Sequence, residues 1–325
     1  MINNYKYFLV LSEELNISNA AKRLYISHQC LSKYLKGLEE KYGVIFFERK
    51  PKFRLTPAGR IMLDTLRHIE LSEKNLESQL EDVRDANSGS IHFGITEGRY
   101  PILIPKLVKE FHEIYPKVEL IICSTNSLKM QEMVLNNELD LYFAGAHNLV
   151  SNKLSYDIAI NEHMYIVISD NLLREYFPND YPECKEVFMR GADLRLFQKV
   201  PFVLNKKNFN SRIILNEHLK EIGASLNCIN EFIQPDIHHR LCAEDYAACF
   251  CLTMYLSGIN QLNQLNQLSN YGSHLNVFPI LNFNRVNPLA LIYNKDKIFP
   301  SYTQDMIKVV KRLCNSYSNS FILKG

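Results

Sequence analysis

The chain lacks the segments that place a protein in or across a membrane. Its 325 residues contain no run of about eighteen apolar residues, and the stretch Met1 to Lys6 has neither the apolar region nor the small-residue cleavage site of a signal peptide. With 46% hydrophobic and 22% charged residues, the composition is that of an ordinary soluble protein of two or three domains. We therefore expect a cytoplasmic protein with no membrane partner.

Recognisable catalytic and metal-binding patterns are also missing. The eight cysteines form no Cys-x-x-Cys pair and have no histidine at zinc spacing. The sequence has no glycine-rich phosphate loop and no nucleophile with a base at a recognisable spacing. We therefore expect no catalytic residue, no metal and no cofactor, and we interpret most cysteines as buried free thiols. For Cys249 and Cys251, redox sensing is the alternative.

The stretch from Ser18 to Glu40 predicts two short helices joined by a tight turn. Ser18 and Ser27 are suited to cap these helices, because a serine hydroxyl accepts a hydrogen bond from an early backbone N–H. In the second helix Leu31, Leu35 and Leu38 fall on one stripe that faces a core. The opposite face carries side chains that can bond base edges or neutralise phosphates. The candidates for DNA contact on this helix are Ser27, His28, Gln29, Ser32, Lys33 and Lys36.

A basic hairpin is expected directly after the helix pair. Residues 44–47 and 48–55 have the pattern of two short strands around a proline-marked turn. Residues 1–58 hold ten Lys and Arg against five Glu, a net charge of +5, whereas the other 267 residues sum to −3. Positive charge confined to one segment favours DNA binding, because counterion release supplies affinity. The candidates for gripping the DNA backbone are Arg49, Lys50, Lys52 and Arg54. The alternative is an ordinary helix pair with a solvated charged face.

A long helix should begin at Thr56-Pro57 and continue to about residue 88. Threonine is a good N-cap, and proline is tolerated at the first helical position. A helix of this length spans roughly 45 Å. Its apolar residues recur at heptad spacing, with Glu73 as the single polar residue in the series. Because this apolar stripe is narrow, we predict that it pairs with the same stripe of a second copy. The seam consists of Met62, Leu66, Ile69, Leu76, Leu80 and Val83. The alternative is that the helix lies along another part of the same chain.

The rest of the chain alternates between strands and helices, which predicts an α/β fold. Three apolar strands separated by two helices within sixty residues indicate a parallel, doubly wound sheet. Near residue 165 the chain should cross into a second lobe and later return, so that the two lobes enclose a cleft. The expected strands are 91–95, 118–123, 139–144, 165–169, 201–204 and 289–293; the expected helices are 102–115, 128–136, 211–222 and 302–313. We interpret the three Gln-Leu units at 261–268 as a helix end or loop.

Ligands of such sheets bind outside the carboxyl ends of the strands. The candidate effector-binding residues at these ends are Thr96, Arg99, Ser124, Thr125 and Asn205. An arginine beside a helix N-terminus suggests an anionic or carboxylated compound. The alternative is that residues 124–127 only cap a helix and that Arg99 is simply solvated.

The chain resembles the LysR-type transcriptional regulators over essentially its whole length. The family's motifs occur here as Ala20-Ala21, Leu31-Ser32-Lys33 with Leu38-Glu39, Phe47-Glu48-Arg49, and Leu55-Thr56-Pro57-Ala58-Gly59. Residues 138–141 also look like the family's third strand of the ligand-binding domain.

The resemblance implies a winged helix-turn-helix over residues 1–58, a linker helix for dimerisation over 59–88, and a two-lobed, periplasmic-binding-protein-like effector domain over 89–325. Lobe I would hold about 89–166 and 281–325, and lobe II about 167–280. The implied protein is a dimer or tetramer that binds an inverted-repeat operator in double-stranded DNA under control of a small-molecule effector. RNA polymerase remains open as a further partner.

Three segments depart from the family pattern. The recognition helix commonly opens serine-glutamine-proline-alanine, but here the residues are Ser27-His28-Gln29-Cys30, so the operator sequence should differ. Residues 243–248 lack the usual glycine-rich turn, and the polar segment 181–190 enlarges the second lobe. A function of another class, a solute-binding or enzymatic two-lobed module whose helix pair reads no DNA, is the alternative. Deletion of residues 1–58 would spare the output of such a module and abolish that of a regulator.

Overall fold

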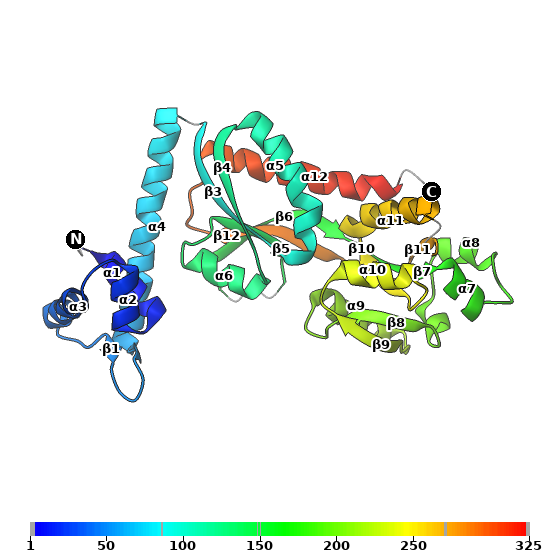
Figure 1. Cartoon of the computed structure of the whole chain (residues 1–325), viewed down its shortest axis with the longest axis horizontal. Helices are drawn as coiled ribbons and strands as arrows, with labels where there is room; N and C mark the ends of the chain where they lie inside the picture. The colour runs from blue at the N-terminus through cyan, green and yellow to red at the C-terminus, as the bar shows by residue number, and fades with distance from the viewer. Residues whose placement is uncertain (1–3, 86, 148, 150, 270–271, 323–325) are drawn as a thin grey trace.

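The computed structural model describes residues 4–85, 87–147, 149, 151–269 and 272–322. An N-terminal helical unit, one long helix and a two-lobed α/β domain follow one another along the chain (Figure 1). The expected order of parts is confirmed.

The N-terminal unit consists of three helices and a short hairpin. These are α1 (Tyr5–Glu14), α2 (Ile17–Arg23), α3 (His28–Tyr42), β1 (Phe47–Glu48) and β2 (Arg54–Leu55). Ser27 caps α3 by accepting a hydrogen bond from the Cys30 N–H at 3.1 Å, as expected. The prediction for Ser18 is wrong, because Asn16 caps α2 two residues earlier, accepting from the Asn19 N–H at 3.0 Å.

The three helices close around one apolar core. Leu31, Leu35 and Leu38 are the buried residues of α3, which confirms the predicted stripe. Helix α1, which the sequence pattern did not reveal, contributes Phe8, whose ring packs against Phe46 with centroids 5.5 Å apart. The polar face of α3 therefore lies on the side away from this core.

The long helix α4 (Pro57–Asp85) begins inside the N-terminal core. Thr56 caps it by accepting from the Gly59 N–H at 3.0 Å. A Cβ on Gly59 would lie 2.1 Å from the Phe46 carbonyl oxygen, so only glycine fits there. Met62 and Leu66 are 8% and 0% exposed within this core. The expectation that these two contribute to an intermolecular seam is wrong, because the chain already buries them.

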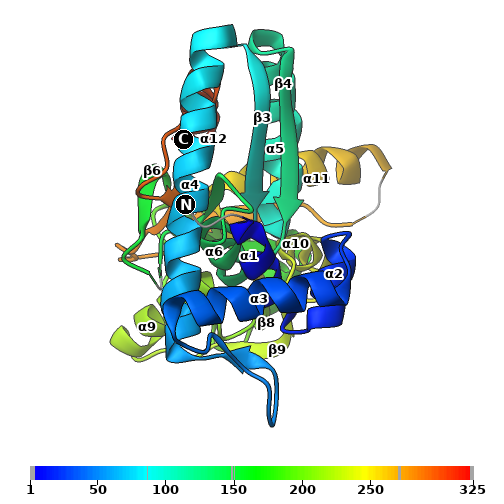
Figure 2. The same cartoon turned by 90° about the vertical axis from the view of Figure 1, so that its left-hand side faces the viewer.

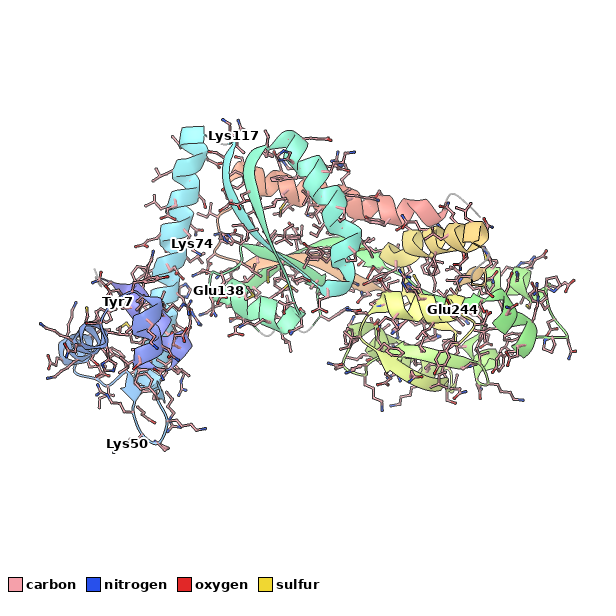
Figure 3. The ribbon with its side chains drawn as sticks, in the orientation of Figure 1. Tyr7, Lys50, Lys74, Lys117, Glu138 and Glu244 are labelled. Carbon is pink, nitrogen blue, oxygen red and sulfur yellow. The ribbon has the colours of Figure 1, made fainter. Side chains whose placement is uncertain are left out.

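The middle of α4 is bonded to the effector domain of the same chain. Asn75 Nδ2 donates to the Asp296 carbonyl at 2.8 Å, and Asn75 Oδ1 accepts from the Ile298 N–H at 2.9 Å. Lys74 donates to the Asn137 carbonyl, and Asn137 Nδ2 donates to Glu70 at 2.9 Å. Lys74 lies about midway along the helix (Figure 3). The polar side of α4 therefore lies along its own chain, as the alternative interpretation predicts.

Lobe I is a five-stranded sheet with the strand order β4-β3-β5-β12-β6. Its elements are β3 (Ser88–Ile95), η1 (Glu97–Arg99), α5 (Tyr100–Ile114), β4 (Lys117–Ser124), α6 (Ser127–Leu135), β5 (Leu141–Gly145), β6 (Leu154–Glu162), β12 (Asn287–Asn294) and α12 (Ser301–Ile322). Strand β3 pairs in parallel with β4 and β5, as predicted. Strand β12, for which the sequence predicts no direction, is antiparallel to β5 and β6. The chain enters β12 on its return from lobe II and therefore runs in the opposite direction.

Lobe II is built from a three-stranded and a two-stranded sheet. Its elements are β7 (Met164–Ser169), α7 (Asp170–Tyr176), α8 (Cys184–Met189), η2 (Leu194–Phe197), β8 (Pro201–Asn205), α9 (Asn210–Glu221), β9 (Asn227–Phe232), α10 (Pro235–Ala243), β10 (Cys249–Leu252), η3 (Thr253–Tyr255), α11 (Leu256–Ser269) and β11 (Leu275–Pro279). The orders are β10-β7-β11 and β8-β9, and a bridge between Phe202 and Ala248 links the two sheets. One large apolar core lies between these strands and the helices.

The chain passes between the lobes twice, from β6 into β7 and from β11 into β12. The Gln-Leu units at 261–268 form the C-terminal part of α11, in agreement with their interpretation as a helix end. Asn263 in this part exchanges two hydrogen bonds with the Leu275 backbone at 2.9 and 2.8 Å. None of the described helices is long and apolar enough to cross a membrane.

Candidate functional site

The free face of α3 carries the residues expected to contact DNA. His28, Gln29, Lys33 and Lys36 are exposed, and Ser32 is half-buried. Lys36 makes a surface ion pair with Glu40 at 3.6 Å, an interaction that water and salt weaken easily. Since Leu31, Leu35 and Leu38 anchor the other side, α3 can enter a groove without disturbing the core.

The β1–β2 hairpin projects from the same unit. Arg49, Lys50 and Lys52 are exposed around its loop, and Lys50 lies at the tip (Figure 3). Arg54 Nε is paired with Glu48 at 2.5 Å, so its charge is partly compensated. Helix α3 and this loop lie at the same end of α4 (Figure 2). One surface thus combines hydrogen-bonding side chains with a flanking row of positive charge.

The outer half of the predicted seam is open on α4. Leu76, Leu80 and Val83 are 55%, 57% and 86% exposed, whereas Ile69 packs at the edge of the N-terminal core. Three large apolar side chains on one exposed stretch are unusual for a chain that acts alone.

The residues expected to line a cleft lie where strands of both lobes end. Thr96 follows β3, Ser124 ends β4 with Thr125 after it, and Asn205 ends β8. Asn205 Nδ2 donates to Ser211 Oγ at 2.8 Å on lobe II, and a cavity of about 20 Å³ beside them has room for roughly one water molecule. Across the cleft, Asn210 Nδ2 donates to Asn287 Oδ1 at 2.6 Å. The lobes are therefore in contact in this structure.

Arg99 does not have the role expected for it. Its guanidinium is turned into the protein and lies 2.6 Å from Glu162, whose side chain is fully buried. Burial alone would lower the pKa of Arg99, but the adjacent Glu162 carboxylate raises it, so the guanidinium stays charged. Because this positive charge is already neutralised, the reason for expecting an anionic effector falls away.

The residues near these strand ends include one that could not be predicted from the sequence, Asn287. His147, just after β5, has a buried Nε2 without a partner in the described chain, as have the Thr96 hydroxyl and Asn205 Oδ1. Such unsatisfied buried groups are candidates for contacts with a ligand or water. Burial lowers the pKa of His147 although a hydrogen bond with Asn287 opposes it. His147 follows a strand end, where ligand binding is expected by the same rule as for Thr96. Asn287 is distant in sequence and carries no local signal.

Metal and redox chemistry find little support in the described residues. No group of three or more His, Cys, Asp and Glu among them could hold a metal ion. Cys249 and Cys251 are buried, and this burial raises the pKa of both thiols. Thiolate, the reactive form, is therefore disfavoured at both positions.

Two buried histidines on α10 should make stability depend on pH. Desolvation, with a smaller contribution from His238, lowers the pKa of His239 to about 4, and burial also lowers that of His238. Below about pH 6.5 the unfolded chain binds protons at these positions whereas the folded chain does not. From pH 6.5 down to about 4, we expect His239 to reduce the free energy of unfolding by about 1.4 kcal/mol per pH unit.

Urea unfolding followed by circular dichroism at pH 7.5 and 5.5 measures this loss. His239→Gln should flatten the pH dependence, whereas His112→Gln, at an exposed position on α5, should leave it unchanged. Equal pH dependence in wild type and His239→Gln would contradict the assignment.

Comparison with known proteins gives consistent matches. Residues 2–60 match the family model of bacterial regulatory helix-turn-helix proteins of the lysR family, and residues 84–227 match that of the LysR substrate binding domain. The HTH-type transcriptional regulator YtlI of Bacillus subtilis is 22% identical over 320 residues, 96% of this chain and 94% of that protein.

Solved structures match over the whole chain as well. A full-length OxyR variant from Pseudomonas aeruginosa has a TM-score of 0.62 at 17% identity, covering 96% of this chain and 97% of that one. Full-length CbnR complexed with its target DNA has a TM-score of 0.55 at 16% identity, covering 96% and 99%. These likenesses support the fold described above.

Proposed function

The chain belongs to the LysR family of DNA-binding transcriptional regulators, with a helix-turn-helix unit and an effector-binding domain, and we propose which of its residues perform each task. Helix α3 reads base edges in the major groove through Gln29, Ser32 and Lys33, with Ser27, His28 and Lys36 at nearby positions. The hairpin grips the flanking backbone through Arg49, Lys50, Lys52 and Arg54.

One observation carries this assignment. The fold anchors α3 by its three leucines and leaves its polar face open beside a basic hairpin, within a segment of net charge +5. That arrangement suits a groove reader whose affinity comes from phosphate neutralisation. Binding to duplex DNA measured at increasing salt tests it, since affinity that ignores salt contradicts a DNA-binding role.

Gln29→Ala and Lys52→Ala should change DNA binding in different ways. Gln29→Ala should alter sequence preference, because a lost base contact costs about 1–3 kcal/mol of discrimination. Lys52→Ala should weaken all sequences about equally and reduce the dependence on salt, because it removes a phosphate contact. Selection from a random duplex library, followed by titration of each variant, measures both effects.

Lys220→Ala is the matched control, since Lys220 is an exposed lysine on α9 in lobe II. It should change neither preference nor affinity. If Gln29→Ala weakens all sequences equally while Lys52→Ala shifts preference, the two roles are reversed.

We also propose that two chains pair through the exposed part of α4 at Leu76, Leu80 and Val83. Pairing would place two α3 helices on one rod, which matches the two-fold symmetry of an inverted-repeat operator. CbnR, whose fold is similar, was solved in complex with its target DNA.

The effector would bind between the lobes, near Thr96, Ser124, Thr125, Asn205 and His147. Since Arg99 is neutralised by Glu162, we propose an uncharged polar compound and not a carboxylate. Such a ligand would have to replace the contact between Asn210 and Asn287 that holds the lobes together here.

We propose domain limits of 1–58 for the DNA-binding unit, 59–88 for the linker helix and 89–325 for the effector domain. The strand pairings favour a change of lobe between Glu162 and Met164 and again between Pro279 and Asn287. The protein would act in the cytoplasm, without catalysis, and RNA polymerase would be its further partner at a promoter.

A further inference from the structure

Tyr25, in the turn between α2 and α3, has an unusual conformation and an unusual exposure. Its φ is +55°, in the left-handed region that favours glycine, and its side chain is 96% exposed. The turn is fixed by two backbone hydrogen bonds, from the Tyr25 N–H to the Lys22 carbonyl at 3.1 Å and from the Ile26 N–H to the Ala21 carbonyl at 3.0 Å. Tyr25 therefore has no freedom to leave this conformation while the helix pair is folded.

Within the folded chain this choice of residue brings no benefit. A side chain in the left-handed region strains the backbone, and glycine or asparagine would avoid most of that strain. An aromatic ring that is almost wholly exposed gains no burial in return. A strained and exposed tyrosine suggests a contact outside the chain.

The position of Tyr25 indicates which contact this is. It lies two residues before Ser27, the cap of α3, and three before His28, the first residue of α3. When a recognition helix lies in the major groove, the helix before it crosses the DNA backbone. The turn that joins the two helices must then lie beside that backbone at the edge of the groove.

We propose that Tyr25 is a DNA-contacting residue, whose phenol donates a hydrogen bond to a phosphate oxygen while its ring lies against the neighbouring sugar. A tyrosine hydroxyl is a recognised donor to phosphate, and such contacts position a protein without reading sequence. The left-handed turn holds the ring away from its own fold and toward the duplex. This inference rests on the DNA-binding function proposed above.

The test compares Tyr25→Asn, Tyr25→Phe and a matched control, Leu15→Asn. Leu15 lies at the other end of α2, has φ +45° and is 42% exposed. Asparagine tolerates the left-handed conformation, so both Asn variants keep the turn and remove only a side chain. The probes are a duplex selected by the wild-type full-length chain from a random library and a mixed-sequence duplex of the same length.

We expect Tyr25→Asn to bind both duplexes about tenfold more weakly, and by the same factor, because the lost contact is to the backbone. Tyr25→Phe should fall between Tyr25→Asn and wild type, since it keeps the ring and loses the donor. Leu15→Asn should bind as wild type does. Tyr25→Asn should also melt no lower than wild type, because it relieves strain.

Unchanged affinity of Tyr25→Asn for the selected duplex overturns the proposal, and so does a loss confined to the selected duplex. If Tyr25→Asn melts lower than wild type, the DNA affinities of Tyr25→Phe and wild type decide the question, because phenylalanine leaves the fold intact. Equal affinities then overturn the proposal. A changed oligomeric state with unchanged DNA affinity assigns Tyr25 to a contact between chains and overturns the proposal. If wild type binds neither duplex, the DNA-binding function fails first.

Discussion

Glu162→Ala should destabilise the effector domain by about 3–5 kcal/mol, because it leaves Arg99 as an unpaired buried charge. The Glu162 side chain is fully buried and accepts from Arg99 at 2.6 Å, from Asn287 Nδ2 at 2.9 Å and from the Met254 N–H at 3.3 Å. Glu162 itself lies at the first crossing between the lobes, and Asn287 lies at the second. Loss of the carboxylate therefore strips hydrogen bonds from the place where the two lobes are joined.

Urea unfolding of the full chain, followed by circular dichroism, measures this effect. Arg285→Ala is the matched control, since Arg285 makes two surface ion pairs with Glu217 and Glu221 and should contribute less than about 1 kcal/mol. The double change of Arg99→Met with Glu162→Leu should recover much of the stability, because no buried charge remains. A loss below about 1 kcal/mol for Glu162→Ala would show that water reaches the pair.

A chain carrying both Leu76→Asp and Leu80→Asp should be monomeric at concentrations where the wild type is a dimer. If these residues form the seam between two copies of α4, each dimer loses four apolar side chains and gains four carboxylates that repel one another. We expect the dimer dissociation constant to rise at least about a hundredfold. Analytical ultracentrifugation measures this constant directly.

Binding of this double variant to an inverted repeat should weaken, because the dimer dissociates. Binding to one half-site should change little, because each monomer keeps its own α3. Val187→Asp is the control, at an apolar position that is 62% exposed on α8 in lobe II. It should leave the dimer intact. A double variant that remains dimeric would move the interface away from this part of α4.

Features that depend on neighbouring residues could be predicted from the sequence. Ser27 is recognisable as a cap because its partner, the Cys30 N–H, is three residues away. The β1–β2 hairpin, α5 and the parallel pairing of β3 with β4 follow from local periodicity and turn residues. The candidate DNA-contacting residues could be named for the same reason, since the pattern of α3 alone determines which face is free.

Features that depend on distant parts of the chain could not be predicted in this way. In the sequence Arg99 resembles a residue that binds an anion. Glu162, which neutralises it, lies 63 residues further on, so no local pattern reveals the pair. The antiparallel direction of β12 depends on where the chain returns from lobe II. Met62 and Leu66 fit a heptad, and only the packing of α1 and α3 shows that they are already buried.

The attachment of α4 at Lys74 and Asn75 gives the chain the mechanics of a lever. Asp64 and Asp82 are bonded to lobe I as well, so the helix turns with that lobe. From Asn75 to the start of the helix at Pro57 the distance is about 26 Å at the usual rise per residue. A rotation of lobe I by about 5°, carried through these hydrogen bonds, displaces that end by roughly 2 Å. A shift of this size breaks hydrogen bonds to base edges, whose geometry tolerates only a few tenths of an ångström, but hardly changes attraction between charges. Small movements of the lobe would thus act on sequence discrimination more strongly than on overall affinity for DNA.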